Sequence, residues 1–237
     1  IQYALTFLLV VSALYFNRQM DMLLHTEPGF RTKNILVAKL IYESQDFNGF
    51  TKERVLAERA RTQLLNEKLL ACPFIEYHQS GYESIIDKTY GTNYVNAKGE
   101  TAYLNIMYVS PQFFQMFDID IEEGAIPEKS GRNIYVLNRA AMKAMNFSSL
   151  EEAAVVEDNR KRKDANAPMV PIVAVVKDYY NGHLSAGAAP ILYNVSGSGG
   201  PRHQIAFPEG KKQDLLNYLK ETMKEVYGAE EFTYSFL

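Results

Sequence analysis

The chain starts with an almost uninterrupted apolar run, IQYALTFLLVVSALYF at residues 1–16. A helix that crosses a bilayer core needs about 20 predominantly apolar residues, so this run is short for a complete span. A cleaved signal peptide would carry basic residues before the apolar run, whereas Arg18 follows it. The pattern favours a partial transmembrane or stalk helix over residues 1–27, and an ordinary buried core helix is the alternative.

The next part of the chain has the pattern of a β-α-β unit. Residues 33–41 form a short apolar run that is typical of a buried strand. Thr51 is a suitable N-cap for the helix that follows, in which leucine and alanine recur at four-residue spacing with charged residues on the other faces. Pro73 ends this helix, and residues 74–80 alternate between apolar and polar as a second strand would.

The last 35 residues repeat this pattern. Residues 203–207 predict a strand, and an amphipathic helix follows with one apolar stripe that ends near Val226. Gly228 is placed to end that helix, and FTYSFL at residues 232–237 predicts a final strand. Because each of the two helices has one apolar side, we expect both to pack side by side on one face of a shared sheet.

These patterns predict an α+β fold with two subdomains. The first is discontinuous, consists of residues 28–80 and 203–237, and has a porter-like βαβ plus βαβ arrangement. The second, residues 81–202, is inserted between its halves and is β-rich with two short helices. Its candidate strands are separated by turn signals and lie at residues 84–95, 101–109, 118–122, 132–138, 170–177 and 190–195.

Two polar stretches of the insertion have simple interpretations. Residues 157–168 contain four consecutive basic residues, which predict a solvated hairpin tip, with a lipid-headgroup or nuclear-type patch as the alternative. SGSGGP at residues 196–201 predicts a flexible connector back to the first subdomain.

Composition narrows the possible functions. The 237 residues are 47% hydrophobic and carry a formal net charge of −3, so no basic face for nucleic acid is expected. Cys72 is the single cysteine, which excludes an intramolecular disulfide. The four histidines have no metal-ligand spacing and are expected at the surface or at interfaces. The sequence therefore predicts no nucleic-acid partner, no metal and no cofactor.

Catalytic motifs are missing from the sequence. No Gly-x-Ser-x-Gly elbow and no Walker A lysine is present, so the chain is predicted not to be an enzyme, and any ATP use belongs to another chain. An enzyme would instead require that His183, Ser185 and Asp178 converge. A ligand-sensing domain of a membrane receptor is the other alternative, with a pocket lined by Tyr77, Tyr82, Tyr90, Tyr94, Tyr103 and Tyr108.

Three stretches carry a recognisable order and spacing: YVSPQFFQMFDIDIEEG at 108–124, IYVLNRAAMKAMNF at 134–147 and VPIVAVVKDYYNGHLSAGAAPILY at 170–193. They resemble the periplasmic core domain of MacB-like and FtsX-like ABC transporter permeases, and the resemblance extends over nearly the whole chain. The positions that match this pattern are Phe113, Phe114, Gly124, Asn138, Val175, Val176, Lys177, Asp178, Tyr179, Leu184 and Pro190.

The resemblance implies a function in transport. It implies the extracytoplasmic domain of a permease subunit in the bacterial inner membrane, on the periplasmic side, that transmits ATP-driven motion to export or release of a substrate. The implied partners are a separate ABC ATPase subunit, a second permease copy, and a periplasmic adaptor or lipoprotein. Two departures concern contacts to neighbours: Asn138-Arg139 replaces the family's Asn-Glu, and the basic segment 157–168 lengthens a turn.

The junction after the first helix is the candidate site for mechanical coupling. Pro28, Gly29 and Phe30 form a turn between the stalk helix and the first strand, and they match the family's Pro-Gly-Phe turn. Proline limits φ, and the aromatic ring of Phe30 is expected to anchor in the core of the first subdomain. No catalytic, cofactor-binding or metal-ligating residue is assigned.

Overall fold

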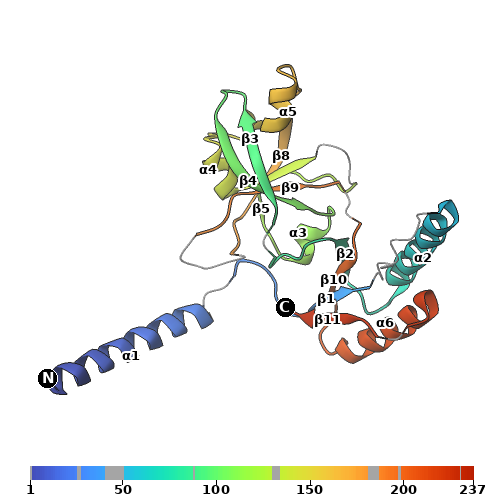
Figure 1. Cartoon of the computed structure of the whole chain (residues 1–237), viewed down its shortest axis with the longest axis horizontal. Coiled ribbons are helices and arrows are strands. Elements are labelled where there is room, and N and C mark those ends of the chain that lie inside the picture. Colours follow the sequence, from blue (N-terminus) through green and yellow to red (C-terminus); the bar gives the residue numbers. More distant parts are fainter. Residues whose placement is uncertain are drawn as a thin grey trace.

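The computed structural model describes residues 2–25, 28–40, 51–87, 89–129, 134–180, 187–196, 199–229 and 231–237 (Figure 1). The helices are α1 (Gln2–His25), α2 (Lys52–Ala71), α3 (Phe113–Met116), α4 (Arg139–Ala144), α5 (Asp158–Lys163) and α6 (Lys212–Tyr227). The strands are β1 (Ile35–Lys39), β2 (Tyr77–Gly81), β3 (Gly91–Asn96), β4 (Thr101–Tyr108), β5 (Ile121–Gly124), β6 (Tyr135–Asn138), β7 (Ala154–Glu157), β8 (Val170–Val176), β9 (Ile191–Asn194), β10 (Arg202–Ala206) and β11 (Thr233–Phe236).

The two chain ends build a four-stranded sheet with the order β11-β1-β10-β2, and all its neighbouring strands are antiparallel. β1-α2-β2 and β10-α6-β11 are therefore interleaved, since a strand of one unit separates the two strands of the other. This is the split β-α-β arrangement. The predicted α+β fold is confirmed.

Helices α2 and α6 cover one face of this sheet, as the sequence predicted (Figure 1). Thr51 caps α2 by accepting a hydrogen bond from the Arg54 N–H, and Gly228 ends α6 in the left-handed conformation. Across the helix pair, the Tyr218 hydroxyl donates to the Lys68 carbonyl at 2.8 Å. The core beneath the helices contains Leu36, Ala38, Leu40, Leu65, Leu69, Cys72, Ile205, Phe207, Leu215, Leu216, Leu219, Met223 and Val226.

The inserted subdomain contains a seven-stranded sheet with the order β5-β8-β6-β9-β4-β3-β7. An additional β7–β8 pairing closes six of its strands into a ring, and β5 pairs with β8 outside the ring. The pairs β4–β9 and β6–β8 are parallel and the others antiparallel. Closure gives β3, β4, β6, β7, β8 and β9 neighbours on both sides, which removes the free edges of an open sheet.

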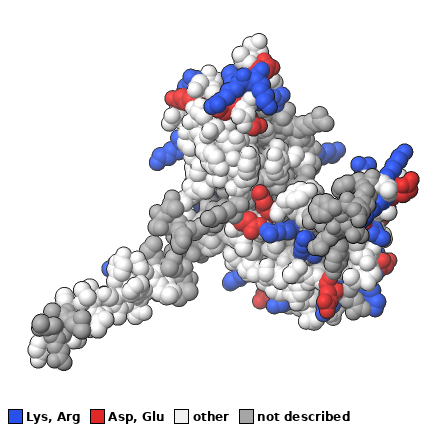
Figure 2. Space-filling model, in the orientation of Figure 1, with Lys and Arg blue, Asp and Glu red and all other residues white. Residues whose placement is uncertain are grey.

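The basic stretch of the insertion lies at the solvated tip of the β7–β8 hairpin, as predicted, since β7 and β8 pair antiparallel on either side of it. Within this tip residues 158–163 form α5, because Asp158 lies in the first helical turn and pairs with Arg162 at 2.6 Å, one turn later. Strand β7, which closes the ring, was not predicted at all. Figure 2 shows the basic side chains of α5 gathered at the tip of the inserted subdomain, away from α1.

The two sheets share a buried core. The open face of the four-stranded sheet contributes Ile35 and Ala206, and the inserted subdomain contributes the aromatic residues of α3 together with strands β6, β8 and β9. Phe113, Phe114 and Met116 of α3 belong to this core, and all are at most 2% exposed. We call this cluster the interface core.

The chain passes between the subdomains at two points that touch each other. A Cβ atom on Gly200 would lie 2.3 Å from the backbone carbon of Gly81, so no side chain fits there. The strand before the insertion and the segment that leaves it are thus held in backbone contact.

Candidate functional site at the helix junction

Residues 28–31, which we call the junction, connect α1 to β1 and contact the inserted subdomain on the way. The Pro28 carbonyl accepts a hydrogen bond from the Tyr180 N–H at 2.8 Å. Gly29 has φ +82°, and a Cβ atom there would lie 3.1 Å from the Asp178 carbonyl oxygen. Both the left-handed backbone and the close approach therefore favour glycine at this position.

Phe30 packs between two aromatic rings of the inserted subdomain. Its centroid lies 6.1 Å from that of Phe117 and 5.4 Å from that of Tyr179, in both cases edge to face. The sequence placed this ring in the core of the first subdomain. It lies instead against the interface core, because residues 113–117 and 177–180 meet the chain where it enters β1.

Arg31 bonds to both subdomains. Its N–H donates to the Phe117 carbonyl at 2.8 Å, and its guanidinium pairs with Glu76, just before β2, at 3.0 Å. Four consecutive residues thus connect α1 to the inserted subdomain and to the four-stranded sheet.

Two buried glutamines add polar contacts between the subdomains. The side-chain oxygen of Gln79 accepts hydrogen bonds from the N–H and hydroxyl of Ser110, at 2.9 and 3.1 Å. The side-chain oxygen of Gln204 accepts from the Ile85 N–H at 3.2 Å. Such bonds between buried groups fix orientation, because breaking them leaves a desolvated polar atom without a partner.

The motif residues of the insertion serve structural roles. Asn138 is fully buried; its side-chain oxygen accepts from the N–H groups of Ala141 and Ile191, and its amide donates to the Ala189 carbonyl at 2.8 Å. It therefore caps α4 and holds β9 at once. Gly124 has φ +75°, and a Cβ there would lie 2.2 Å from the Val173 carbonyl oxygen, so glycine is required.

Asp178 is a capping carboxylate that follows the apolar strand β8. It accepts a hydrogen bond from the Ala140 N–H at 2.9 Å in the first turn of α4. Burial raises the pKa of its carboxyl above the usual value, against the lowering effect of that hydrogen bond. Arg139, the departure from the family pattern, pairs with Glu122 and Glu123 of β5 and so binds within the chain.

The register between β2 and β10 creates a histidine pair that sequence reasoning missed. Nε2 of His78 and Nδ1 of His203 are 2.7 Å apart and the rings are stacked. His203 is fully buried, unlike the surface or interfacial position expected for most of the histidines. Desolvation lowers the pKa of His78 to about 4, and burial together with the neighbouring imidazole lowers the pKa of His203 to about 3.

Helix α1 extends away from the two sheets (Figure 1) and is almost free of charged side chains in Figure 2. Phe7, Leu14 and Phe16 each expose between 64% and 71% of their surface, far more than a core helix would. Within the described residues, no helix combines the length and apolarity of a complete membrane crossing.

The two alternative functions, an enzyme and a ligand-sensing domain, gain no support from the described residues. His183 and Ser185, proposed partners of Asp178, lie outside them, as does Leu184. The six tyrosines do not line one pocket: Tyr94 is buried, Tyr77 packs against the interface core, and Tyr82, Tyr90, Tyr103 and Tyr108 are exposed. Among the described residues, no cluster of three histidine, cysteine or acidic side chains could hold a metal ion.

No family model and no curated protein matches the chain, whereas solved structures do. The periplasmic region of MacB from Actinobacillus actinomycetemcomitans matches with a TM-score of 0.52 and 14% identity, over 86% of this chain and 89% of that one. A domain of a protein assigned as a permease from Porphyromonas gingivalis matches with a TM-score of 0.53 and 12% identity, over 88% and 92%.

The extracellular domain of YknZ, a noncanonic ABC-type transporter from Gram-positive bacteria, matches with a TM-score of 0.54 and 9% identity. That match covers 86% of this chain and all of the other. The resemblance inferred from the three motif stretches is thus confirmed at the level of the fold.

Proposed function

We propose that this chain is the extracytoplasmic domain of an ABC transporter permease subunit and that it transmits ATP-driven motion. The observation that carries the proposal is the junction, where residues 28–31 contact both sheets directly after an exposed apolar helix. The likeness to outer domains of a MacB protein and of an ABC-type transporter supports the same class.

In this proposal the apolar part of α1 lies in the bilayer. Residues 3–16 span roughly 20 Å of helix at 1.5 Å per residue, and their exposed side chains prefer hydrocarbon to water. The domain then lies on the periplasmic side of a bacterial inner membrane. Its partners are a separate ATPase subunit, a second permease copy, and an adaptor or lipoprotein.

The junction converts a helix movement into a movement of the whole domain. Pro28 restricts φ, Phe30 is held between two rings, and Arg31 bonds to residues of both subdomains. A movement that reaches the junction therefore acts on both sheets together.

The test compares Phe30→Ala with Phe74→Ala in the assembled transporter. Phe74 is a matched control, since it is also partly buried but packs beneath α2 and α6, away from the junction. Export is followed with the substrate whose extracytoplasmic level falls when the parent gene is deleted. We expect Phe30→Ala to reduce export while ATP binding by the partner subunit and membrane levels are kept, and Phe74→Ala to export normally. Normal export by the Phe30→Ala variant would mean that the domain serves only to dock partners and does not transmit motion.

A further inference from the structure

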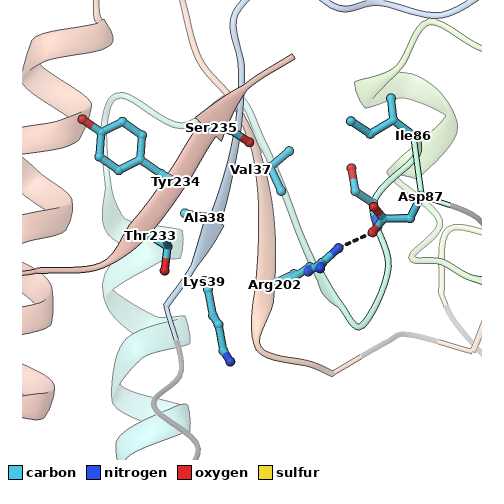
Figure 3. Close-up of a pocket in the computed structure, with 10 residues that line it drawn as sticks. Val37, Ala38, Lys39, Ile86, Asp87, Arg202, Thr233, Tyr234 and Ser235 are labelled. Atoms are coloured by element: carbon cyan, nitrogen blue, oxygen red, sulfur yellow. Dashed lines mark hydrogen bonds and ion pairs between the residues drawn. The ribbon is translucent and has the colours of Figure 1, made fainter.

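One face of the four-stranded sheet is covered along only half of its length. Ile35, Ala206 and Leu237 pack against the interface core, whereas farther along the same strands an open groove of about 400 Å³ lies beside β1 and β11 (Figure 3). The groove is lined by Val37, Ala38, Lys39, Ser84, Ile86, Asp87, Arg202, Thr233, Tyr234 and Ser235.

The wall of this groove is fixed in place. Arg202 of β10 forms an ion pair with Asp87, and the Ser84 N–H donates to the Asp87 carboxylate at 2.8 Å. The neighbouring Ile85 is buried in the interface core. A ligand would therefore meet a preformed groove and would not have to order a loop.

The groove opens beside β11, which is the outer strand of the sheet in the described part of the chain. The Leu237 N–H donates to the Ile35 carbonyl, so in an antiparallel ladder residues 233 and 235 also direct their backbone groups to β1. The N–H groups of Tyr234 and Phe236 then point outward. Neither has a hydrogen-bond partner among the described residues.

This edge lacks most features that protect exposed strands from pairing. The segment TYSF contains no charge and no proline, and its register with β1 shows no bulge. Its outward donors lie next to two side-chain surfaces. One is the groove, and the other is an aromatic row in which Tyr234, turned away from the groove in Figure 3, lies 5.8 Å from Phe236.

Charge indicates what kind of segment fits. The lining contains two cations, Lys39 and Arg202, and one carboxylate, Asp87. Arg202 is paired with Asp87, whereas the exposed Lys39 has no ion-pair partner among the described residues. A strand added to β11 would place alternate side chains on the groove face, where an acidic one would meet Lys39.

We propose that an extended, acidic segment of a partner polypeptide pairs with β11 as a fifth strand of this sheet. Its backbone bonds to the outward groups of Tyr234 and Phe236, its acidic side chain pairs with Lys39, and an apolar neighbour covers Val37. The proposal does not rest on the transport function, because it depends only on the edge and the groove.

Two peptides with fluorescein at the N-terminus test it: Thr-Val-Thr-Asp-Thr-Val-Thr amide, and the same peptide with lysine in place of aspartate. As strands, both place valine and the central charge on one face. Fluorescence anisotropy is measured with the full chain in dodecyl maltoside micelles. We expect saturable binding of the aspartate peptide, about tenfold tighter than the lysine peptide. Lys39→Glu should reverse that order.

Tyr234→Pro removes an outward N–H without touching the bonds to β1, and Tyr234→Thr keeps the N–H while removing the ring. We expect the proline variant to lose binding of the aspartate peptide at least about tenfold, and the threonine variant to bind within about threefold of the unmodified chain. Unchanged melting temperatures verify the fold. No saturable binding, equal binding of both peptides, or unaltered binding by Tyr234→Pro would each overturn the proposal.

Discussion

The two halves of one sheet face differ in what covers them. At the Ile35 end the face is buried under the inserted subdomain and lies next to the junction, whereas at the Lys39 end it is open. The covered half packs the two subdomains against each other, and the open half leaves polar and charged groups accessible. The same short strands thus pack against the inserted subdomain at one end and are accessible to solvent at the other.

Truncating the covered half should have the largest effect. Ile35→Ala removes a fully buried side chain from the interface core and should lower the free energy of unfolding by about 2–5 kcal/mol. Val37→Ala, two residues along on the same face but in the open half, should cost under about 1 kcal/mol. Urea unfolding of the full chain in detergent measures both losses. Equal losses would mean that the two halves are not differently covered.

Acid should weaken the sheet through the histidine pair. Because the folded pKa values, about 4 for His78 and about 3 for His203, lie below the ordinary 6.5, the unfolded chain binds more protons in that range. The free energy of unfolding should therefore fall as pH drops from about 6.5 to about 5, by on the order of 3 kcal/mol for the two histidines together. Urea midpoints across this range should fall more steeply than those of the double variant His78→Gln, His203→Gln. Parallel profiles would contradict this.

Loss of the Phe30 ring should have a smaller effect on stability. The ring makes two edge-to-face contacts, worth about 0.5–1.5 kcal/mol each, so Phe30→Ala should cost about 1–3 kcal/mol. The domain should remain folded, with its circular dichroism spectrum unchanged and a modestly lower melting temperature. Unfolding of this variant at ambient temperature would show that the main role of Phe30 is to stabilise the fold.

The ion pair at the groove should contribute least. Arg202 and Asp87 are both partly exposed, so Asp87→Asn should change the free energy of unfolding by under about 1 kcal/mol, and less at high salt. Thermal melts at low and high salt measure this. A loss comparable to that of Ile35→Ala would show that the open half carries stability as well.

Local patterns predicted the parts of the fold that depend on neighbours in sequence. The Thr51 cap, the apolar stripe of α6 and the left-handed Gly228 all follow from residue types within one or two helical turns. Ring closure through β7 and the pairing of His78 with His203 depend on strand register between distant segments, which periodicity does not encode. The turn at Pro28 could be predicted from its residues. Phe117 and Tyr179, which contact Phe30 in this turn, could not be predicted, because they lie far away in the sequence.

If the junction transmits motion, the two sheets should move as one body. Paired spin labels at Lys98 and Lys220 report the distance between the inserted subdomain and α6, and single labels at Lys161 report the distance between the tips of two copies. Both are measured in the reconstituted transporter with ADP and with ATP plus vanadate. We expect an unchanged Lys98–Lys220 distance, a shifted tip distance, and loss of that shift when Gly-Ser is inserted between Gly29 and Phe30. A Lys98–Lys220 distance that changes with nucleotide, or a tip shift that survives the insertion, would contradict this expectation.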